Sequence, residues 1–460
     1  MASKNNAIGY LPDERPPFIE LILFALQQIV VMFPATVLVA LITHFHVSTT
    51  IFASGLATLC FILITGRKIP LYYGSSFSYI TAISSIVTAD IVSANDPALL
   101  NGAISEAQFG IIMSAFVSIA AGFIIKAVGQ DLIDKILPAT VTGSIAMIIG
   151  LSLAGSALTD ASAIPAAVAG TSDETLAQNM AWVISLITLI STIAYSVYLK
   201  GKLSQLPILF GLLTGYASAL IIGWITGIPF VSFNNTELSG IFNIPEFTLP
   251  KPSLRAVAAI MPIAIATIPE STAHVYQLDI YVNDLAKKKG SNKRYNIADK
   301  LGLNLIGDGL GDIISGFIGG PAGTNYGENI STMAISKVFS VPVLIAASII
   351  TMIIACFTPL VNAVYSIPKC VIGGLSIYLF GVIAAQGITI MLDRKVDMFS
   401  SKNLAIIAII LIIGLGGSFG YADGMIPMFG LKCPALATAA VAGIIFNLIL
   451  SIGKKEEKAE

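Results

Sequence analysis

Two glutamates and a histidine lie inside long apolar stretches of this chain. Glu270 and His274 belong to the run MPIAIATIPESTAHVY, and their i, i+4 spacing places both on one face of a helix. Glu328 follows a Gly- and Pro-rich stretch that begins at Gly319. Ionisable groups at membrane depth are costly and persist mainly where they are used. These three residues therefore indicate a binding site within the apolar part of the chain.

The chemistry of these groups suits a flat, neutral ring with adjacent N–H and C=O groups. An ionised Glu accepts two N–H bonds, and a protonated Glu donates to a carbonyl. His274 titrates in the physiological range and can pass a proton. No buried Arg or Lys accompanies the two acids, which disfavours an anionic ligand. We therefore expect proton-coupled uptake of a nucleobase-like solute.

The segments that carry Ser75–Phe77 and Gly327–Glu328 must position the ligand. Each reads as a short extended piece followed by a half-helix, whose free N–H groups can donate to a carbonyl. Broken spans of this kind mark binding sites in transporters. Phe77 and Tyr326 could stack on a planar ligand or could be packing aromatics. Ser76, Asn329 and Asp308 are assigned supporting roles.

Each of these groups also has a structural interpretation. A buried carboxylate such as Glu270 or Glu328 could be a satisfied hydrogen-bond partner, and His274 could cap its span. Asp308 and Asp312 fall four residues apart beside glycines. We expect both to bond the backbone of the broken segment near Glu328.

Composition makes the chain an integral membrane protein. The hydrophobic fraction is 55%, charged residues make up 11%, and the mean hydropathy is +0.86, whereas soluble domains carry about 25% charged residues. A net charge of −1 argues against a nucleic-acid partner. The four cysteines have no metal or redox spacing, three histidines form no metal motif, and no cofactor is expected. Residues 1–17 lack the pattern of a cleaved signal peptide.

Fourteen apolar segments are expected. The third and tenth are short and punctuated by Gly and Ser, and these two contain the strand plus half-helix units. The ranges are 18–43, 49–66, 72–92, 106–127, 132–156, 180–199, 204–227, 253–276, 297–317, 322–339, 341–359, 364–390, 402–420 and 432–452.

The distribution of basic residues predicts the orientation. With the N-terminus inside, 21 of the 25 Lys and Arg residues fall on the cytoplasmic side, as the positive-inside rule expects. Both termini are therefore expected in the cytoplasm, including a cytoplasmic tail at 453–460. The expected location is the cell membrane.

Matching motifs seven segments apart predict an inverted repeat. Leu137-Pro138 echoes Ile367-Pro368, and Pro207 echoes Pro434. The run from Tyr73 to Phe77 echoes the run that starts at Tyr326, at an offset of 253 residues. A repeat unit with an odd number of spans gives the two halves opposite orientations. The fold class is thus an all-α polytopic membrane protein with 7+7 inverted repeats.

Five stretches carry a resemblance to the nucleobase–ascorbate transporter family, and within it to bacterial uracil permeases. Together they extend over nearly the whole chain, and the part around 326–336 is the family signature. The stretches are LQQIVVMFPATVLV (26–39), GSSFSYI (74–80), PESTAH (269–274), GDGLGDIISGFIGGPAGTNYGENISTMAIS (307–336) and IPKCVIGGLSIYLFGVI (367–383).

The resemblance implies a division into core and gate domains and a possible homodimer through the gate. The core comprises residues 1–130 and 251–360, and the gate comprises 131–230 and 361–452. Glu270 and Glu328 would hold the base, and Phe77 and Gly327 would bond it through the backbone. His274, with Glu270, would take part in proton coupling. Xanthine and urate carriers of the family usually have Gln where this chain has Glu328, so the acid favours uracil.

The sequence departs from the uracil permeases at several motif positions. Gln28 replaces a common His, Pro34 a Gly, Ser331 a Gly, Ser336 a Thr, and Asn325 a small hydroxyl residue. These changes leave the exact base open, with a xanthine, urate or other purine:proton symporter as the alternative.

Rival functions remain. An anion carrier of the related sulfate-carrier fold would use half-helix dipoles without an acid at Glu328. A membrane enzyme could be imagined from Ser75, Ser76 and His274, but no nucleophile-elbow or zinc motif supports it. Titratable groups within the spans argue for coupled transport over a passive channel. The coupling ion could also be sodium, because broken helices can build such a site from backbone carbonyls.

Overall fold

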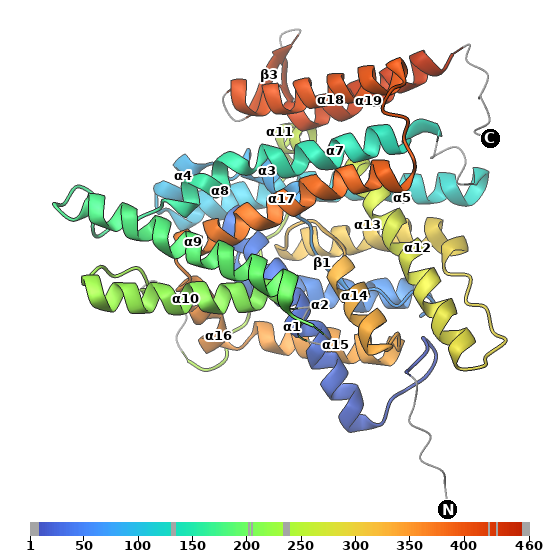
Figure 1. Ribbon diagram of the computed structural model, residues 1–460, viewed down its shortest axis with the longest axis horizontal. Helices are drawn as coiled ribbons and strands as arrows, with labels where there is room; N and C mark the ends of the chain where they lie inside the picture. The colour runs from blue at the N-terminus through green and yellow to red at the C-terminus, as the bar shows by residue number, and fades with distance from the viewer. Residues whose placement is uncertain are drawn as a thin grey trace, which may run out of the picture.

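The computed structural model describes residues 9–129, 135–200, 203, 206–232, 240–421, 424–428 and 431–452. These residues form mostly helices, with two small antiparallel sheets (Figure 1). In the described part, ten helical runs are long and apolar enough to cross a membrane, and two shorter apolar helices accompany them. The fold is therefore that of a helical polytopic membrane protein. The predicted tail, 453–460, lies outside the described residues.

The first half of the chain supplies eleven of the described elements. In chain order they are α1 (Phe18–Thr43), α2 (Val47–Ile64), β1 (Tyr73–Ser75), the 3-10 helix η1 (Phe77–Tyr79), α3 (Ile80–Ser84), α4 (Ala89–Ser93), α5 (Pro97–Val128), α7 (Ala139–Ser152), α8 (Ala154–Ala161), α9 (Glu174–Tyr198) and α10 (Pro207–Thr226).

The second half continues with the broken span that carries Glu328. Its described elements are α11 (Leu254–Ile260), η3 (Met261–Ile263), α12 (Ala264–Lys288), η4 (Ala298–Lys300), α13 (Leu301–Ile318), β2 (Gly323–Asn325), α14 (Gly327–Ser336), α15 (Val341–Ala355), α16 (Thr358–Tyr365), α17 (Lys369–Asp393), α18 (Ser401–Gly420), β3 (Met425–Met428), β4 (Leu431–Pro434) and α19 (Ala435–Ser451).

Proline and glycine set several helix boundaries. Pro138 and Pro368 are the N-cap residues of α7 and α17, and Pro434 is that of α19. Proline suits this position because it lacks an N–H and cannot extend the helix backwards. Gly319 ends α13 with a φ of 100°, a left-handed conformation that glycine adopts without steric cost. The chain can therefore turn directly from α13 into the segment that leads to β2.

Several predicted segment ends differ from the helix ends; α5, for example, begins at Pro97 and not at 106. The eighth apolar segment was expected to end at 276, but α12 continues to Lys288. Its last turns carry Asp279, Asp284 and two lysines, which are polar but compatible with a helix. Hydropathy therefore marked the apolar part of this helix and missed its polar end.

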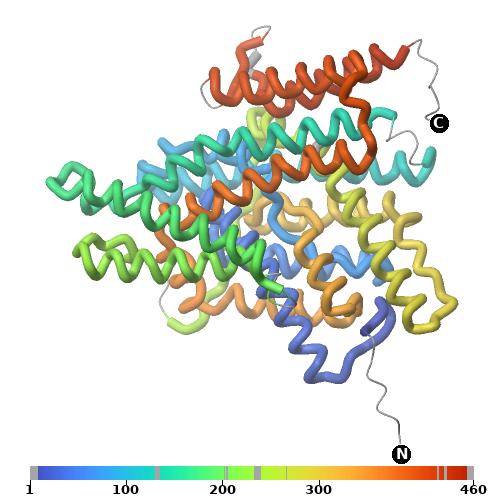
Figure 2. The backbone as a smooth tube through the Cα atoms, viewed as in Figure 1, coloured from blue at the N-terminus to red at the C-terminus, as the bar shows by residue number. Residues whose placement is uncertain are grey.

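The helices pack in two groups, drawn mainly below and above the middle of Figure 1. In the first group, α13 packs against α5 and α2, and α15 packs against α2 and α1. In the second group, α17 packs against α7, α8 and α9, while α18 packs against α7 and α19. The groups meet where α7 contacts η1 and α12 and where α1 contacts α10. In Figure 2, segments from the first and second halves of the chain lie side by side in each group.

Candidate functional site

The two broken spans meet in a short antiparallel sheet. β1 pairs with β2 in the register Tyr73–Asn325, Gly74–Thr324 and Ser75–Gly323. Two further backbone bonds flank it, from Ser76 N to Ala322 O (2.9 Å) and from Tyr326 N to Tyr72 O (3.0 Å). This pattern is locally two-fold symmetric and relates Tyr73 to Gly323, an offset of 250 residues.

The register corrects the motif alignment made on the sequence, which used an offset of 253. With an offset of 250, Phe77 corresponds to Gly327 and Ser78 to Glu328. The two Tyr-Gly pairs are therefore not equivalent in space, because the pairing is set by backbone hydrogen bonds and not by side-chain identity.

Tyr326 is buried at the sheet, with an exposed fraction of 4%. Its hydroxyl donates to Ser75 O (2.8 Å) and lies 3.1 Å from the Thr36 hydroxyl. Its ring lies against Gly74, where a side chain would collide with it. Tyr73 packs in the same way against Gly323. Tyr326 thus joins the strands, and its predicted stacking on a ligand has no open surface in this conformation.

Glu328 lies in the first turn of α14, directly after the half-helix begins at Gly327. Its side chain is exposed, whereas the next side chain, Asn329, is fully buried. The first N–H groups of a helix have no partner within the helix, and the Glu328 carboxylate accepts a hydrogen bond from its own backbone N–H. A ligand at this helix start can therefore meet both backbone N–H groups and a carboxylate.

Glu270 and His274 lie on α12, which packs against α14 and β2. A Cβ atom at Gly327 would come within 2.9 Å of His274 Nε2, so the imidazole borders the start of α14. Glu270 is close enough to Glu328 for their charges to interact, and the Ser78 hydroxyl hydrogen-bonds to it. Three predicted site residues from two elements, Glu270, His274 and Glu328, thus lie together.

His274 has one nitrogen in use and one free. The ring hydrogen-bonds to the backbone of Asn325 in β2, while its buried Nδ1 has no partner among the described residues. A histidine held by one nitrogen keeps its second nitrogen for proton exchange. The geometry therefore leaves one position of the imidazole available for a proton or a ligand.

Asp312 and Asp308 on α13 fix the strand that leads to α14. Asp312 accepts from Gly323 N (2.7 Å) and from the Tyr73 hydroxyl, so it bonds the backbone of the broken segment as expected. Asp308 instead bonds side chains, accepting from Asn325 Nδ2 (2.7 Å) and from the Ser271 hydroxyl. The Asn325 side-chain amide therefore connects β2 to α13 through Asp308.

Asn329 ties α14 to α1. Its Nδ2 donates to Gln28 O (3.0 Å) and to Gln28 Oε1 (2.8 Å). Its Oδ1 is buried without a partner among the residues described. Gln28, noted on sequence only as a departure from the family pattern, therefore supports the helix that carries Glu328.

Phe77 and Ser76 lie at the start of the opposite half-helix. Ser76 caps η1 by accepting from Ser78 N (3.3 Å). Phe77 is half-buried and packs against the cluster that contains Leu379 and Phe380 of α17. Phe77 therefore stands where the two groups of helices meet.

Sequence reasoning missed four residues of this network. They are Thr36, which bonds Tyr326; Ser78, which bonds Glu270; and Ser271 and Asn304, which bond Asp308. Asn304 lies four residues before Asp308 on α13, a spacing that puts the two on one helix face. That spacing was the available signal; the hydroxyl residues gave none, because Ser and Thr are common in spans.

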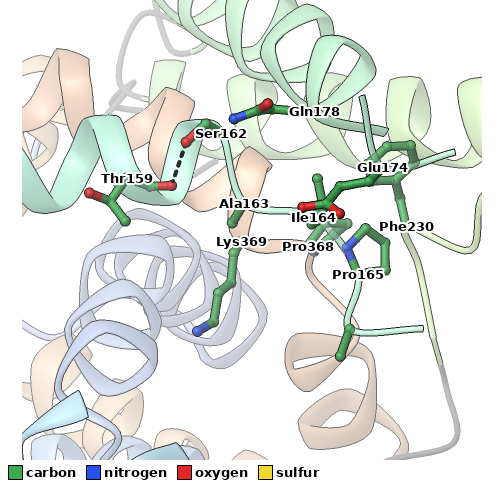
Figure 3. A pocket seen from close by; sticks show the side chains of 11 residues that line it. Thr159, Ser162, Ala163, Ile164, Pro165, Glu174, Gln178, Phe230, Pro368 and Lys369 are labelled. Carbon is green, nitrogen blue, oxygen red and sulfur yellow. Dashed lines mark hydrogen bonds between the residues drawn. The ribbon is translucent and has the colours of Figure 1, made fainter. Parts of the chain in front are cut away.

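A cavity of about 620 Å³ lies elsewhere, and Figure 3 shows it. No predicted site residue lines it, and its residues come from α8, α9, the segment between these helices and the segments around Phe230 and Pro368. It is lined by Thr159, Ser162, Ala163, Ile164, Pro165, Ala166, Glu174, Gln178, Phe230, Pro368 and Lys369.

Comparisons with known proteins agree on one family. The model described as "Permease family", for xanthine and uracil permeases, matches residues 19–422. The chain is 33% identical to the uracil permease of Bacillus caldolyticus, covering 95% of this chain and 94% of that protein. It is 34% identical to the uracil permease of Escherichia coli strain K12, covering 98% and 96%.

Solved structures share the fold at low sequence identity. The structure of SLC26A9 has a TM-score of 0.62 at 13% identity, covering 96% of this chain and 66% of that one. The transmembrane domain of the cyanobacterial bicarbonate transporter BicA has a TM-score of 0.55 at 14% identity, covering 94% and 97%. At such identities the likeness concerns the fold alone.

Proposed function

Because the chain belongs to the nucleobase–ascorbate transporter family, we propose that it takes up uracil together with a proton by alternating access. Membership of a permease family makes it a transport protein and not an enzyme. The observation that carries the proposal is the meeting of Glu270 and Glu328 beside the free start of α14. Uracil is neutral and planar, and it presents N–H donors and carbonyl acceptors that such a site can match.

In this proposal Glu328 and Glu270 accept N–H bonds from the base, and the backbone N–H groups at Gly327 and Phe77 donate to its carbonyls. Phe77 and Tyr326 were predicted to contact the base, and Ser76, Asn329 and Asp308 keep the supporting roles predicted from the sequence. Each of two carboxylates whose charges interact disfavours the ionisation of the other. One of them therefore binds a proton readily, and this is the physical basis for coupling.

His274 is the second proton carrier in the proposal. Its ring borders Gly327 and keeps Nδ1 free of protein partners in the described part of the chain. A proton at His274 or Glu270 reduces the repulsion at the site and favours binding. Release of that proton on the other side of the membrane then weakens the hold on the base, which links transport to the pH gradient.

The proposed architecture has fourteen spans as 7+7 inverted repeats. The local two-fold symmetry of β1 and β2 supports it. The two packing groups support a core of residues 1–130 and 251–360 and a gate of 131–230 and 361–452. Because Phe77 lies at the junction of the groups, its contacts with α17 would change when the groups move relative to each other.

The protein is multi-pass, and we propose that it lies in the cell membrane with both termini in the cytoplasm, as the distribution of basic residues favours. Apolar faces of α9 and α10 are largely exposed, which fits contact with lipid or with a second gate domain in a homodimer.

Two alternatives deserve a test. A purine:proton symporter of the same family would place a larger ring at the same glutamates. An anion carrier would match the fold of SLC26A9 and BicA, but the acid at Glu328 repels an anion from the helix start.

The test is uptake by proteoliposomes with an imposed pH gradient, comparing uracil, xanthine, urate and sulfate. Gradient-dependent uptake of uracil is the expected result. If uracil uptake is unchanged when the pH gradient is collapsed, the proposal of proton coupling is wrong. If the protein prefers xanthine or sulfate, the proposed substrate is wrong. When the same assay is applied to variants of Glu328, Asp90→Asn is the matched control, because Asp90 is an exposed carboxylate on α4, away from the site.

A further inference from the structure

The N-terminal segment, residues 9–14, forms a strap across the end of α14. Tyr10 N donates to Lys337 O (2.8 Å), and Phe339 N donates to Tyr10 O (2.8 Å). Val341 N donates to Pro12 O (3.1 Å). Lys337 is the C-cap residue of α14, with a φ of 57°. The strap therefore pairs with the backbone on which the Glu328 helix ends.

Side chains of the same strap hold the loop that follows α12. Glu14 Oε2 lies 2.5 Å from Lys289 Nζ, and Asp13 Oδ2 lies 2.6 Å from Lys293 Nζ. The Tyr295 hydroxyl donates to Asp13 Oδ1 at 2.5 Å, and Lys289 Nζ also donates to Gly9 O at 2.9 Å. In Figures 1 and 2 the dark-blue N-terminal segment accordingly runs beside the yellow loop after α12.

The strap thus joins the ends of the two elements that carry the acids. α12 carries Glu270 and His274, and α14 carries Glu328. α14 has only 10 residues, fewer than an isolated helix needs to hold its shape. Its position therefore depends on its neighbours: β2 at the start, α1 and α12 along its length, and the strap at the end.

We propose that the strap is a positioning element, in which Asp13 and Glu14 hold α12 and α14 at the spacing that Glu270 and Glu328 need to grip a ligand. The consequence for affinity rests on the proposed function; the structural role of the strap does not. The strap touches neither carboxylate, so its effect is on binding geometry. Its ionic contacts are partly exposed and weaken with salt.

The first test needs no substrate. Hydrogen–deuterium exchange of the full chain in detergent compares the parent protein with Asp13→Asn/Glu14→Gln. Exchange should rise about tenfold in peptides covering 327–341, by the local opening that such measurements report, and should stay unchanged in α10. The control is Asp284→Asn, which removes an exposed contact of 2.5 Å to Lys288 on the same helix end without touching the strap. Unchanged exchange at 327–341 in the double variant would contradict the proposal that Asp13 and Glu14 hold α14 in position.

The second test measures affinity. Exposed ion pairs contribute little one by one, so the double variant should raise the Kd for uracil about three- to tenfold while the maximal uptake rate stays near the parent value. Raising salt from 50 to 500 mM (about a threefold shorter screening length) should weaken binding by the parent protein and leave the double variant unaffected. An unchanged Kd in the double variant overturns the link between strap and site.

Exchanging the charges of Glu14 and Lys289 tests whether the ion pair itself, and not one particular side chain, positions the helices. Glu14→Lys and Lys289→Glu should each raise the Kd, and the combined variant should recover most of the affinity. Failure of that recovery overturns the ion pair as the positioning contact. If the parent protein binds no uracil, the proposed function fails. The hydrogen–deuterium exchange measurement still decides whether the strap holds α14.

Discussion

The two broken spans share a backbone arrangement but differ in how they are anchored. In the first, hydroxyl groups of α2 hold β1: Ser54 donates to Tyr73 O (2.8 Å), and Thr58 accepts from Tyr73 N (3.0 Å). In the second, carboxylates of α13 hold β2: Asp312 accepts from Gly323 N, and Asp308 binds the Asn325 side chain. Hydrogen bonds to charged groups are roughly twice as strong as neutral ones, so the second span is held more firmly.

They differ again at the helix starts. Symmetry at an offset of 250 places Phe77 and Ser78 opposite Gly327 and Glu328. One half thus offers an apolar ring and a hydroxyl, and the other offers an open backbone and an acid. A third carboxylate at Ser78 would add repulsion to Glu270 and Glu328. A symmetric backbone can therefore form one polarised site when only one of the two helix starts carries a charged residue.

Removing the carboxylate of Glu328 should have the largest effect on transport. Glu328→Ala should lower the uptake rate at low substrate by about 100-fold or more, since losing a charged hydrogen-bond partner costs about 3 kcal/mol. Ser78→Ala, at the equivalent position, removes one hydrogen bond to the Glu270 carboxylate and should lower the rate less, by about tenfold. Uptake of labelled uracil by proteoliposomes measures both.

The anchors give the next contrast. Asp312→Ala leaves the Tyr73 hydroxyl and the Gly323 N–H without their acceptor, at a cost of about 3 kcal/mol. Thr58→Val leaves only the Tyr73 N–H unpaired, because Ser54 still serves Tyr73 O, at a cost of about 1 kcal/mol. Thermal unfolding in detergent should rank them in this order; equal losses would contradict the difference in anchoring.

Two glycines test the packing of the strands. The Cβ of an alanine at Gly323 would meet the Tyr73 ring and Gly74 O, whereas the three atoms nearest to a Cβ at Gly74 all belong to the Tyr326 side chain. Overpacking costs about 1–3 kcal/mol, and Gly323→Ala should lie at the upper end because a backbone atom cannot move aside. Gly102→Ala is the control, since nothing lies within 4 Å of its added Cβ. Melting temperatures of the three variants check the order.

The smallest effect concerns pH at the strap. Burial disfavours ionisation of Asp13, but hydrogen bonds from Lys293 and Tyr295 outweigh it and lower its pKa. A carboxyl group with a lowered pKa in the folded state stabilises the fold above its unfolded pKa of about 3.9 and loses this effect as pH falls through the folded value.

The groups that face Asp13 are Lys293 and Tyr295, with Glu14 and Lys289 alongside. Asp13→Asn should therefore melt about 1–2 °C below the parent protein at pH 7, and the gap should narrow as the pH falls below about 3.9. A gap that does not change with pH would show that ionisation of Asp13 does not hold the strap.

Much of this protein was predictable from local patterns. Glu270 and His274 share a helix face because their spacing fits the helical period, and the glycines and prolines before Glu328 required a break. Pro138 and Pro368, matched on the sequence as repeat positions, each directly precede a helix, α7 and α17. The end of α12 was missed, because a helix continues through polar residues that no membrane signal marks.

Residue types and their periodicity determined the membrane class, the acids of the candidate site and the family. Only the tertiary structure decided the offset of 250, the bond of Asn329 to Gln28 and the strap of residues 9–14 across α14. The reason is physical. Local patterns report the cost of placing a side chain in lipid or in a helix, whereas these contacts join groups far apart in the chain. Their existence depends on the fold that brings them together.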